Sequence, residues 1–224
     1  QHISARNRNY CELTALYWAR HNVEADYYGL MHYRRLFDFT GAFGRQECRT
    51  LNRRTAARLG LDDATIASQL QATDIILPHP VDVPGGESVY DQYCRACFEE
   101  DIARLRKSVL GEAPSMVEDF DATFRATRAY YFNMFVMRRC LFLPFADWLF
   151  SVFERMDPLV DWENRHGYQQ RVFGFLGERL LNVYMRHLLR TRPHRVTELP
   201  VVCVSGRRRN FLHALHEQRK RLVQ

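Results

Sequence analysis

The stretch that constrains the fold most is residues 26–39, which read D-Y-Y-G-L-M-H-Y-R-R-L-F-D-F. Its first half is aromatic and apolar, as in a buried β-strand, and it meets the polar run 32–35 with no turn residue between them. In open α/β sheets, ligands bind just beyond the carboxyl ends of the strands. We therefore expect a central strand that delivers charge to the ligand-binding edge of a sheet.

The charge in this stretch comes from His32, Arg34 and Arg35. The planar guanidinium group of arginine binds phosphate oxygens two at a time, so the pattern suits a phosphate or diphosphate ligand. The alternative is an edge strand whose arginines only pair with carboxylates of a neighbouring helix. The residues alone leave both interpretations open.

The rest of the chain alternates between helical and strand patterns. Apolar periodicity and capping residues predict helices over residues 10–21, 62–70, 88–110, 115–128, 141–155 and 168–189. Apolar runs predict further strands over residues 73–77, 130–139 and 197–204, and residues 41–60 are predicted as an arginine-rich loop. Gly174 and Gly177 predict that another backbone approaches the last helix closely. The class is therefore α/β.

Composition limits the number of domains and the class of partner that the chain can have. The chain has 224 residues, of which 46% are hydrophobic, enough for one large domain or for one domain with an appendage. The net charge of +6 indicates an anionic partner, and nucleic acid, a membrane surface and a nucleotide all qualify. No apolar run reaches the roughly 20 residues that a membrane span needs, and no signal peptide is recognisable. We expect a cytoplasmic protein.

The six cysteines are scattered through a chain too large to need disulfides, so we expect reduced thiols. Cys94 and Cys97 form a C-x-x-C inside a helical pattern, without a second pair of ligands at zinc spacing. We interpret the motif as incidental and predict no metal site.

Three polar residues fall within apolar patterns. Asn133 lies in the predicted strand 130–139, where a buried amide must bond either the backbone or a ligand. Glu178 lies beside the apolar stripe of the last helix, so it is either ion-paired or available for acid/base chemistry. Arg171 is the expected partner of Glu178 in the structural alternative.

Residues 205–224 form a basic tail with apolar residues on one side. This pattern fits a helix on a membrane surface, a connector to another domain, or a frayed end.

Several ordered blocks of the chain resemble a bacterial family long catalogued as a domain of unknown function, whose members are described as glycosyltransferases of capsular polysaccharide, exopolysaccharide or O-antigen biosynthesis. The resemblance runs from Ser4 to about Val202. It rests on N-R-N-Y-C-E-L-T-A-L-Y-W-A-R-H-N, D-Y-Y-G-L-M-H-Y-R-R-L-F, D-I-I-L-P, Y-F-N-M-F-V-M, G-Y-Q-Q-R-V-F-G-F-L-G-E-R-L-L-N-V-Y and E-L-P-V-V.

The resemblance implies a GT-A-like (Rossmann-like) mixed sheet flanked by helices, a nucleotide-sugar donor and a glycan or lipid-linked glycan acceptor. From family association we expect UDP-galactose as the donor. Such enzymes usually carry an acidic D-x-D motif that holds a divalent metal, Mg²⁺ or Mn²⁺, on the donor diphosphate. Here His32, Arg34 and Arg35 stand at that place. Fixed cations could neutralise the leaving diphosphate without a metal.

The resemblance also implies roles for individual residues. We expect Glu178, or an acid near it, to act as the base, and Asn133 and Arg171 to orient the donor or acceptor. Tyr10 and Glu12 are further expected substrate contacts, and Glu12 is the next candidate acid. Members of the family usually begin with a further strand and helix, so we expect an N-terminally incomplete domain over residues 1–204. A non-catalytic scaffold of a polysaccharide assembly complex is the main alternative. A nucleic-acid-binding module is disfavoured, because no nucleic-acid motif accompanies the dispersed basic residues.

Overall fold

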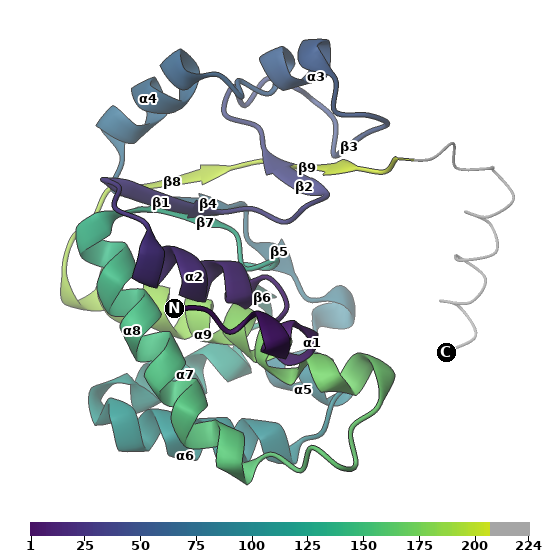
Figure 1. Ribbon diagram of the computed structural model, residues 1–224, viewed down its shortest axis with the longest axis vertical. Coiled ribbons are helices and arrows are strands. Elements are labelled where there is room, and N and C mark those ends of the chain that lie inside the picture. The colour runs from purple at the N-terminus through teal and green to yellow at the C-terminus, as the bar shows by residue number, and fades with distance from the viewer. Residues whose placement is uncertain (207–224) are drawn as a thin grey trace, which may run out of the picture.

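The computed structural model describes residues 1–206 and is built around a mixed four-stranded sheet in the order β1-β7-β4-β8 (Figure 1). The strands are β1 (Tyr27–Leu30), β4 (Ile75–Pro78), β7 (Phe135–Arg138) and β8 (Val196–Leu199). β7 is antiparallel to β1 and β4, and β8 is parallel to β4. The carboxyl ends of β1, β4 and β8 therefore lie at the same edge of the sheet.

Two smaller sheets continue from this edge. β2 (Arg35–Phe37) and β3 (Glu47–Cys48) flank β9 (Val201–Val204) in the order β2-β9-β3. β5 (Val81–Asp82) pairs with β6 (Arg128–Ala129). Because β2 follows β1 and β9 follows β8, the second sheet extends the chain beyond the carboxyl ends of the main strands.

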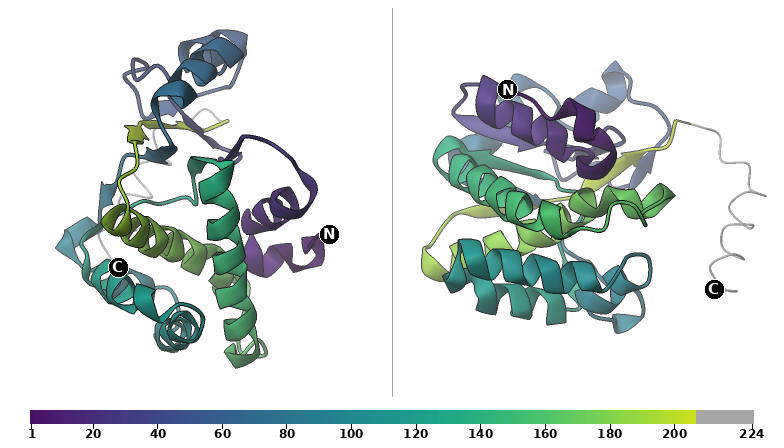
Figure 2. Two further views of the ribbon diagram at one scale, coloured as in Figure 1. Left: turned by 90° about the vertical axis from the view of Figure 1, so that its left-hand side faces the viewer. Right: turned by 60° about the horizontal axis from the view of Figure 1, so that its bottom comes forward.

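Helices cover both faces of the main sheet, as Figures 1 and 2 show. α3 and α4 lie on one side, and α2, α8 and α9 lie on the other, with α6 and α7 farther out. α6 packs against α8 and α7 against α9. The α-helices are α1 (Asn7–Tyr10), α2 (Leu13–Asn22), α3 (Arg53–Arg58), α4 (Asp63–Ala72), α5 (Val89–Cys94), α6 (Glu100–Glu112), α7 (Val117–Arg125), α8 (Arg139–Met156) and α9 (Val172–Thr191).

The predicted mixed sheet flanked by helices is confirmed, whereas several element boundaries were wrong. The strand expected to be central is β1, at the edge of the sheet, and a turn at Tyr33 and Arg34 separates it from β2. Residues 130–134 are not a strand, because Phe132 and Asn133 have positive φ angles of 76° and 53°. Pro200 divides the predicted closing strand into β8 and β9, which belong to different sheets.

The predicted helices also differ from the structure at their breaks. Cys11 has a φ of 51° and separates α1 from α2, where one helix was expected. Residues 95–99 divide the expected helix 88–110 into α5 and α6, and residues 41–60 contain β3 and α3 instead of loop alone. All six cysteines are free, as expected. The basic tail lies outside the described residues from residue 207 onward.

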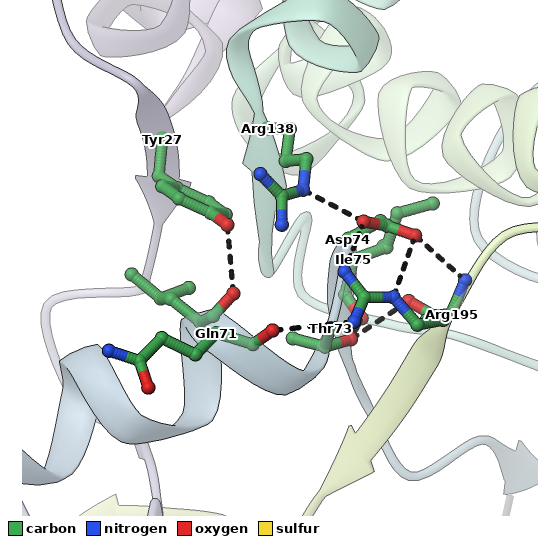
Figure 3. A network of polar contacts seen from close by, with 8 residues as sticks. Tyr27, Gln71, Thr73, Asp74, Ile75, Arg138 and Arg195 are labelled. Carbon is green, nitrogen blue, oxygen red and sulfur yellow. Dashed lines mark hydrogen bonds and ion pairs between the residues drawn. The ribbon is translucent and has the colours of Figure 1, made fainter.

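Asp74 joins the amino-terminal ends of β4 and β8 to the carboxyl end of the antiparallel strand β7 (Figure 3). Its carboxylate accepts hydrogen bonds from Arg138 Nε at 2.8 Å and from the backbone N–H of Arg195 at 3.0 Å, and Arg195 Nη2 lies 3.0 Å from it. These contacts, led by those of Arg195, lower the pKa of Asp74 far below its ordinary value. The polar anchor lies at the edge opposite the carboxyl ends of β1, β4 and β8.

Two glycines of α9 allow the close approach that the sequence predicted. The atoms nearest to them belong to the side chains of Cys11, between α1 and α2, and of Leu13, the first residue of α2. A Cβ atom on Gly174 would lie 2.8 Å from Cys11 Sγ and 3.1 Å from Cys11 Cβ. A Cβ atom on Gly177 would lie 2.6 Å from Leu13 Cδ1. Since Cys11 is already held at a positive φ, its backbone has little freedom to move away.

We expect Gly174→Ala to lower the free energy of unfolding by about 1–3 kcal/mol, because the added methyl group overpacks the contact with Cys11. The matched control is Gly111→Ala near the end of α6, where the added Cβ would meet nothing closer than 3.7 Å. That variant should gain up to about 1 kcal/mol, because alanine has the higher helix propensity. Urea unfolding of both variants measures the difference, and equal effects would contradict the packing argument.

Candidate functional site

A cavity of about 440 Å³ opens at the carboxyl end of β1, and we call it the cationic cavity. It is bounded by the turn after β1, the start of α2, α5, the turn before β7, and the first half of α9 with the residues that precede it. It brings together six residues predicted from the sequence: Glu12, His32, Arg34, Arg35, Arg171 and Glu178. These residues come from three separate parts of the chain, so their assembly is a property of the fold.

The turn after β1 is organised around the ring of His32. His32 Nδ1 lies 3.2 Å from the backbone nitrogen of Arg34, from which it accepts a hydrogen bond, and 3.3 Å from Arg35 Nη1. Burial and the neighbouring Arg35 lower the pKa of His32. His32 is therefore a neutral acceptor at neutral pH that contacts the Arg35 guanidinium and the Arg34 backbone, and the fixed positive charge comes from the guanidinium groups.

Arg35 is half-buried and Arg34 is exposed. The Arg35 guanidinium lies 4.1 Å from the centroid of the Phe132 ring, a cation–π contact that fixes its position. Arg34 lies 4.9 Å from the centroid of the Tyr33 ring. Neither arginine has a carboxylate partner within 4.0 Å among residues 1–206. Both guanidinium groups can therefore bind an anion.

Glu178 lies on α9 with both carboxylate oxygens engaged. Oε1 accepts the backbone N–H of Phe132 at 3.0 Å, and Oε2 accepts Arg179 Nη1 at 2.8 Å. Burial raises the pKa of Glu178, although the Arg179 charge opposes that effect. The predicted pairing of Glu178 with Arg171 is wrong, because Arg179 takes that place.

Glu12 stands just before α2 and is held at one oxygen only. Its Oε1 accepts a hydrogen bond from Asn133 Nδ2 at 2.8 Å, and Asn133 Nδ2 also donates to the carbonyl of Gly174 at 3.0 Å. Asn133 is 2% exposed and does not line the cavity, so it orients Glu12 from the protein interior. Within residues 1–206, Glu12 Oε2 has no hydrogen-bond partner.

Arg171 lines the cavity ahead of α9 and donates from Nε to Cys11 Sγ at 3.2 Å. Its guanidinium also lies 5.1 Å from the centroid of the Phe175 ring. Tyr10, in contrast, is 4% exposed and packs with its ring centroid 4.6 Å from that of Phe173. The structure places Tyr10 in the hydrophobic core and outside the cavity.

A second cavity of about 610 Å³ adjoins the first, and the two share Arg35 and Phe132 as lining residues. It extends over the ends of β4 and β8 and is lined by Pro78, His79 and Pro200, among others. Asp38, which also lines it, accepts the backbone N–H groups of Thr40 and Phe43 at 3.1 and 2.8 Å. Its carboxylate therefore shapes the loop that follows.

Sequence reasoning missed other lining residues of the cationic cavity. They are Gln92 on α5, Tyr131 before β7, Tyr168 before α9, and Arg179, which is 7% exposed. Gln92 Oε1 accepts Arg179 Nη2 at 2.7 Å, which joins α5 to α9. Arg179 falls among the apolar positions of the helix predicted over residues 168–189. An arginine at such a buried position was the sequence feature that could have identified it as a site residue.

The residues of the cavity do not fit a divalent metal. Within residues 1–206, no three histidine, cysteine, aspartate or glutamate side chains gather in a way that could hold a metal ion. Arginine cannot ligate a cation, and four of the residues that line the cavity are arginines: Arg34, Arg35, Arg171 and Arg179. Cys94 and Cys97 are likewise not part of such a group. No step is therefore assigned to a metal.

No helix within residues 1–206 combines the length and the apolar character that crossing a membrane requires.

A search of curated proteins gives no match. Among solved structures, the chain is similar to the apo structure of the WbbM bifunctional glycosyltransferase, with a TM-score of 0.86 and 31% sequence identity. The similarity covers 92% of this chain and 38% of the WbbM chain, so the present chain corresponds to well under half of that enzyme's length. The match supports a fold shared with a glycosyltransferase.

The comparison with family models extends over most of the chain. A single model, described as a domain of unknown function (DUF4422), matches residues 1–190, which include β1, β4, β7 and all the residues of the cationic cavity. The chain therefore belongs to the DUF4422 family.

Proposed function

We propose that the protein is a glycosyltransferase that moves a sugar from a nucleotide-sugar donor, with UDP-galactose as our first choice, to a growing bacterial surface polysaccharide. The observation that carries the proposal is the cationic cavity at the carboxyl end of β1, where Glu12 and Glu178 meet Arg34 and Arg35, two arginines with no carboxylate partner among residues 1–206. Similarity to the WbbM bifunctional glycosyltransferase supports the same reaction class. The acceptor is a glycan or a lipid-linked glycan.

Arg34 and Arg35 are proposed to bind the donor diphosphate. Charge builds up on this group as the glycosidic bond breaks, and preorganised cations stabilise it without a reorganisation cost. Arg35 is preorganised by Phe132 and His32, since its guanidinium lies over the Phe132 ring and contacts His32 Nδ1. The neutral state of His32 lets its Nδ1 accept hydrogen bonds from the Arg35 guanidinium and from the Arg34 backbone.

Glu12 is the better of the two candidate bases. A base must accept the proton of the acceptor hydroxyl, which requires a carboxylate oxygen within about 3 Å and free to accept. Glu178 already uses both oxygens, whereas Glu12 has one oxygen held by Asn133 and one free within residues 1–206. We therefore propose Glu12 as the base, Asn133 as its positioning residue, and Glu178 as the group that holds the turn before β7.

The direct test is nucleoside diphosphate release from a panel of nucleotide sugars, with and without EDTA. The proposal predicts sugar-specific release that persists in EDTA. Release that EDTA abolishes would support glycosyltransferase activity but overturn the proposal that the diphosphate is bound without a metal. No release from any donor, with or without a lipid extract as acceptor, would favour the scaffold alternative.

Arg35→Ala should weaken binding of UDP by about 10- to 100-fold, because a charge-assisted hydrogen bond contributes about 1.5–3 kcal/mol. Arg54→Ala is the matched control, since Arg54 is an exposed arginine of α3 that does not line the cavity. Calorimetric titration with UDP measures both variants at fixed ionic strength. Equal losses in the two variants would show that only the overall charge matters.

Glu12→Gln should lower the rate of sugar transfer about 10²- to 10⁴-fold while leaving UDP affinity within a few-fold, as expected for loss of a general base. Asn133→Ala should lower the transfer rate less, because it removes the orientation and retains the carboxylate. Initial rates with saturating donor measure both effects. A Glu12→Gln enzyme with normal transfer rates would remove Glu12 from the mechanism.

Glu178 should instead influence the pH dependence of stability. Because burial raises its pKa above the ordinary 4.5, the folded protein binds this proton more tightly than the unfolded chain. Its contribution to stability is complete below the ordinary pKa and is lost as the pH rises through the raised pKa. The unfolding free energy of the wild type, relative to Glu178→Gln, should therefore fall as the pH rises from 4 through the raised pKa. Urea titrations at several pH values measure it, and an increase would contradict the assignment.

A further inference from the structure

The positive charge of the described chain is concentrated in residues 34–58, which form β2, β3, α3 and the loops between them. This segment contains seven arginines and two acidic residues, a net charge of +5 with histidine neutral. The other residues of 1–206 carry 19 basic and 23 acidic side chains, a net charge of −4. The fold therefore combines one cationic region with an otherwise acidic remainder.

The arginines of this segment also differ from the others in their partners. Elsewhere in residues 1–206, 13 of 18 arginines lie within 4.0 Å of a carboxylate. None of the seven arginines of residues 34–58 has such a partner among the described residues. Arg35 is half-buried, and the other six are exposed. Their charge is available to a partner from outside.

Hydrogen bonds of the small sheet bring distant parts of the segment together. The backbone N–H of Val204 donates to the carbonyl of Arg34 at 2.8 Å, and that of Gly206 donates to the carbonyl of Arg49 at 3.0 Å. Arg34 and Arg49 therefore flank the carboxyl end of β9. α3 begins four residues after Arg49 and lies over the same sheet (Figure 1). We call the exposed arginines near this end of the sheet the arginine patch: Arg34, Arg49, Arg53 and Arg54.

Two strongly exposed side chains with apolar surface stand among these arginines. Leu51, between Arg49 and Arg53, is 49% exposed, and Tyr33, beside Arg34, is 78% exposed. Nucleic acid would use the guanidinium groups but would give Leu51 no apolar partner. Arginine together with exposed leucine and tyrosine instead suits the surface of an anionic membrane, where phosphates lie next to the acyl chains.

We propose that the arginine patch is a docking surface for a membrane that contains anionic phospholipids. The arginines bind the lipid phosphates, and Leu51 and Tyr33 reach the boundary of the acyl chains. Tyr33 and Arg34 also line the cationic cavity, and Arg45 lines the adjoining one, so docking brings both cavities near the membrane surface. The inference goes beyond the proposed function and concerns the bulk lipid, not the substrate.

The direct test is flotation of the full chain with phosphatidylcholine vesicles, with and without about 30% phosphatidylglycerol. The proposal predicts binding to the anionic vesicles alone, and weaker binding as salt is added, because salt screens the attraction. Equal binding to both kinds of vesicle, or binding to neither, would overturn it. So would binding to duplex DNA that depends on the arginine patch, in the absence of vesicle binding.

The test variant changes three arginines of the patch that line neither cavity: Arg49→Ala, Arg53→Ala and Arg54→Ala. The matched control changes three exposed arginines outside the segment that also lack a carboxylate partner within residues 1–206: Arg8→Ala, Arg186→Ala and Arg192→Ala. The test variant should bind anionic vesicles about 100-fold more weakly, because each arginine near such a surface contributes about fivefold. Equal losses in both variants would show that only net charge matters and would overturn the patch.

Lysine at the same three positions should preserve vesicle binding, because a charged surface does not require the planar fork of arginine. Loss of binding in the lysine variant would indicate a specific phosphate site and contradict the proposal. Leu51→Asn should weaken vesicle binding about 3- to 10-fold without changing the charge. Its control is Leu110→Asn on α6, since Leu110 is 47% exposed and lies outside the segment.

UDP titration and donor cleavage by the same variants separate this surface from the proposed function. The patch variants should bind UDP as tightly as the wild type. Normal UDP binding and donor cleavage, with vesicle binding that the alanine variant leaves unchanged, would overturn the docking surface alone. Vesicle binding that depends on the patch, without UDP binding or release from any donor, would retain the docking surface and overturn the proposed transfer reaction.

Discussion

The turn before β7 is held against α9 by four side-chain hydrogen bonds, and the rest of the site depends on this contact. Asn182 bonds both backbone groups of Tyr130, Glu178 accepts from the N–H of Phe132, and Asn133 donates to the carbonyl of Gly174. Phe132 and Asn133 have positive φ angles, which cost about 1–3 kcal/mol each in non-glycine residues. The hydrogen bonds offset that cost, and they place the Phe132 ring under Arg35 and the Asn133 amide against Glu12.

Burial also affects the protonation of two ionisable groups of the cavity, His32 and Glu178. Desolvation lowers the pKa of His32 and raises that of Glu178, so each is shifted toward its neutral form. The guanidinium groups of Arg34 and Arg35 keep their charge under all relevant conditions, because arginine is not deprotonated in proteins. Four arginines and two glutamates line the cavity, and this excess of positive charge is what connects the geometry to a diphosphate ligand.

Much of the site could be predicted from the sequence, because apolar runs that end in charge mark the ends of buried strands. That reasoning predicted Arg34 and Arg35, whereas Glu12, Arg171 and Glu178 were candidates from helices, and the fold brings all five to one cavity. The partner of each group could not be predicted. Whether Glu178 pairs with Arg171 or Arg179 depends on how residues 167–171 enter α9, and the position of β1 at the sheet edge depends on long-range pairing. Positive φ angles at Phe132 and Asn133 are imposed by tertiary contacts that no local pattern records.

The central claim is that the cationic cavity binds the diphosphate of a nucleotide sugar through Arg34 and Arg35. A crystal structure of the protein soaked with UDP tests it most directly. The account predicts diphosphate density in the cavity bounded by Glu12 and Arg35, with phosphate oxygens at hydrogen-bond distance from both arginines. Diphosphate density in the adjoining cavity over β4 and β8, or bound through a metal ion on carboxylates, would contradict it.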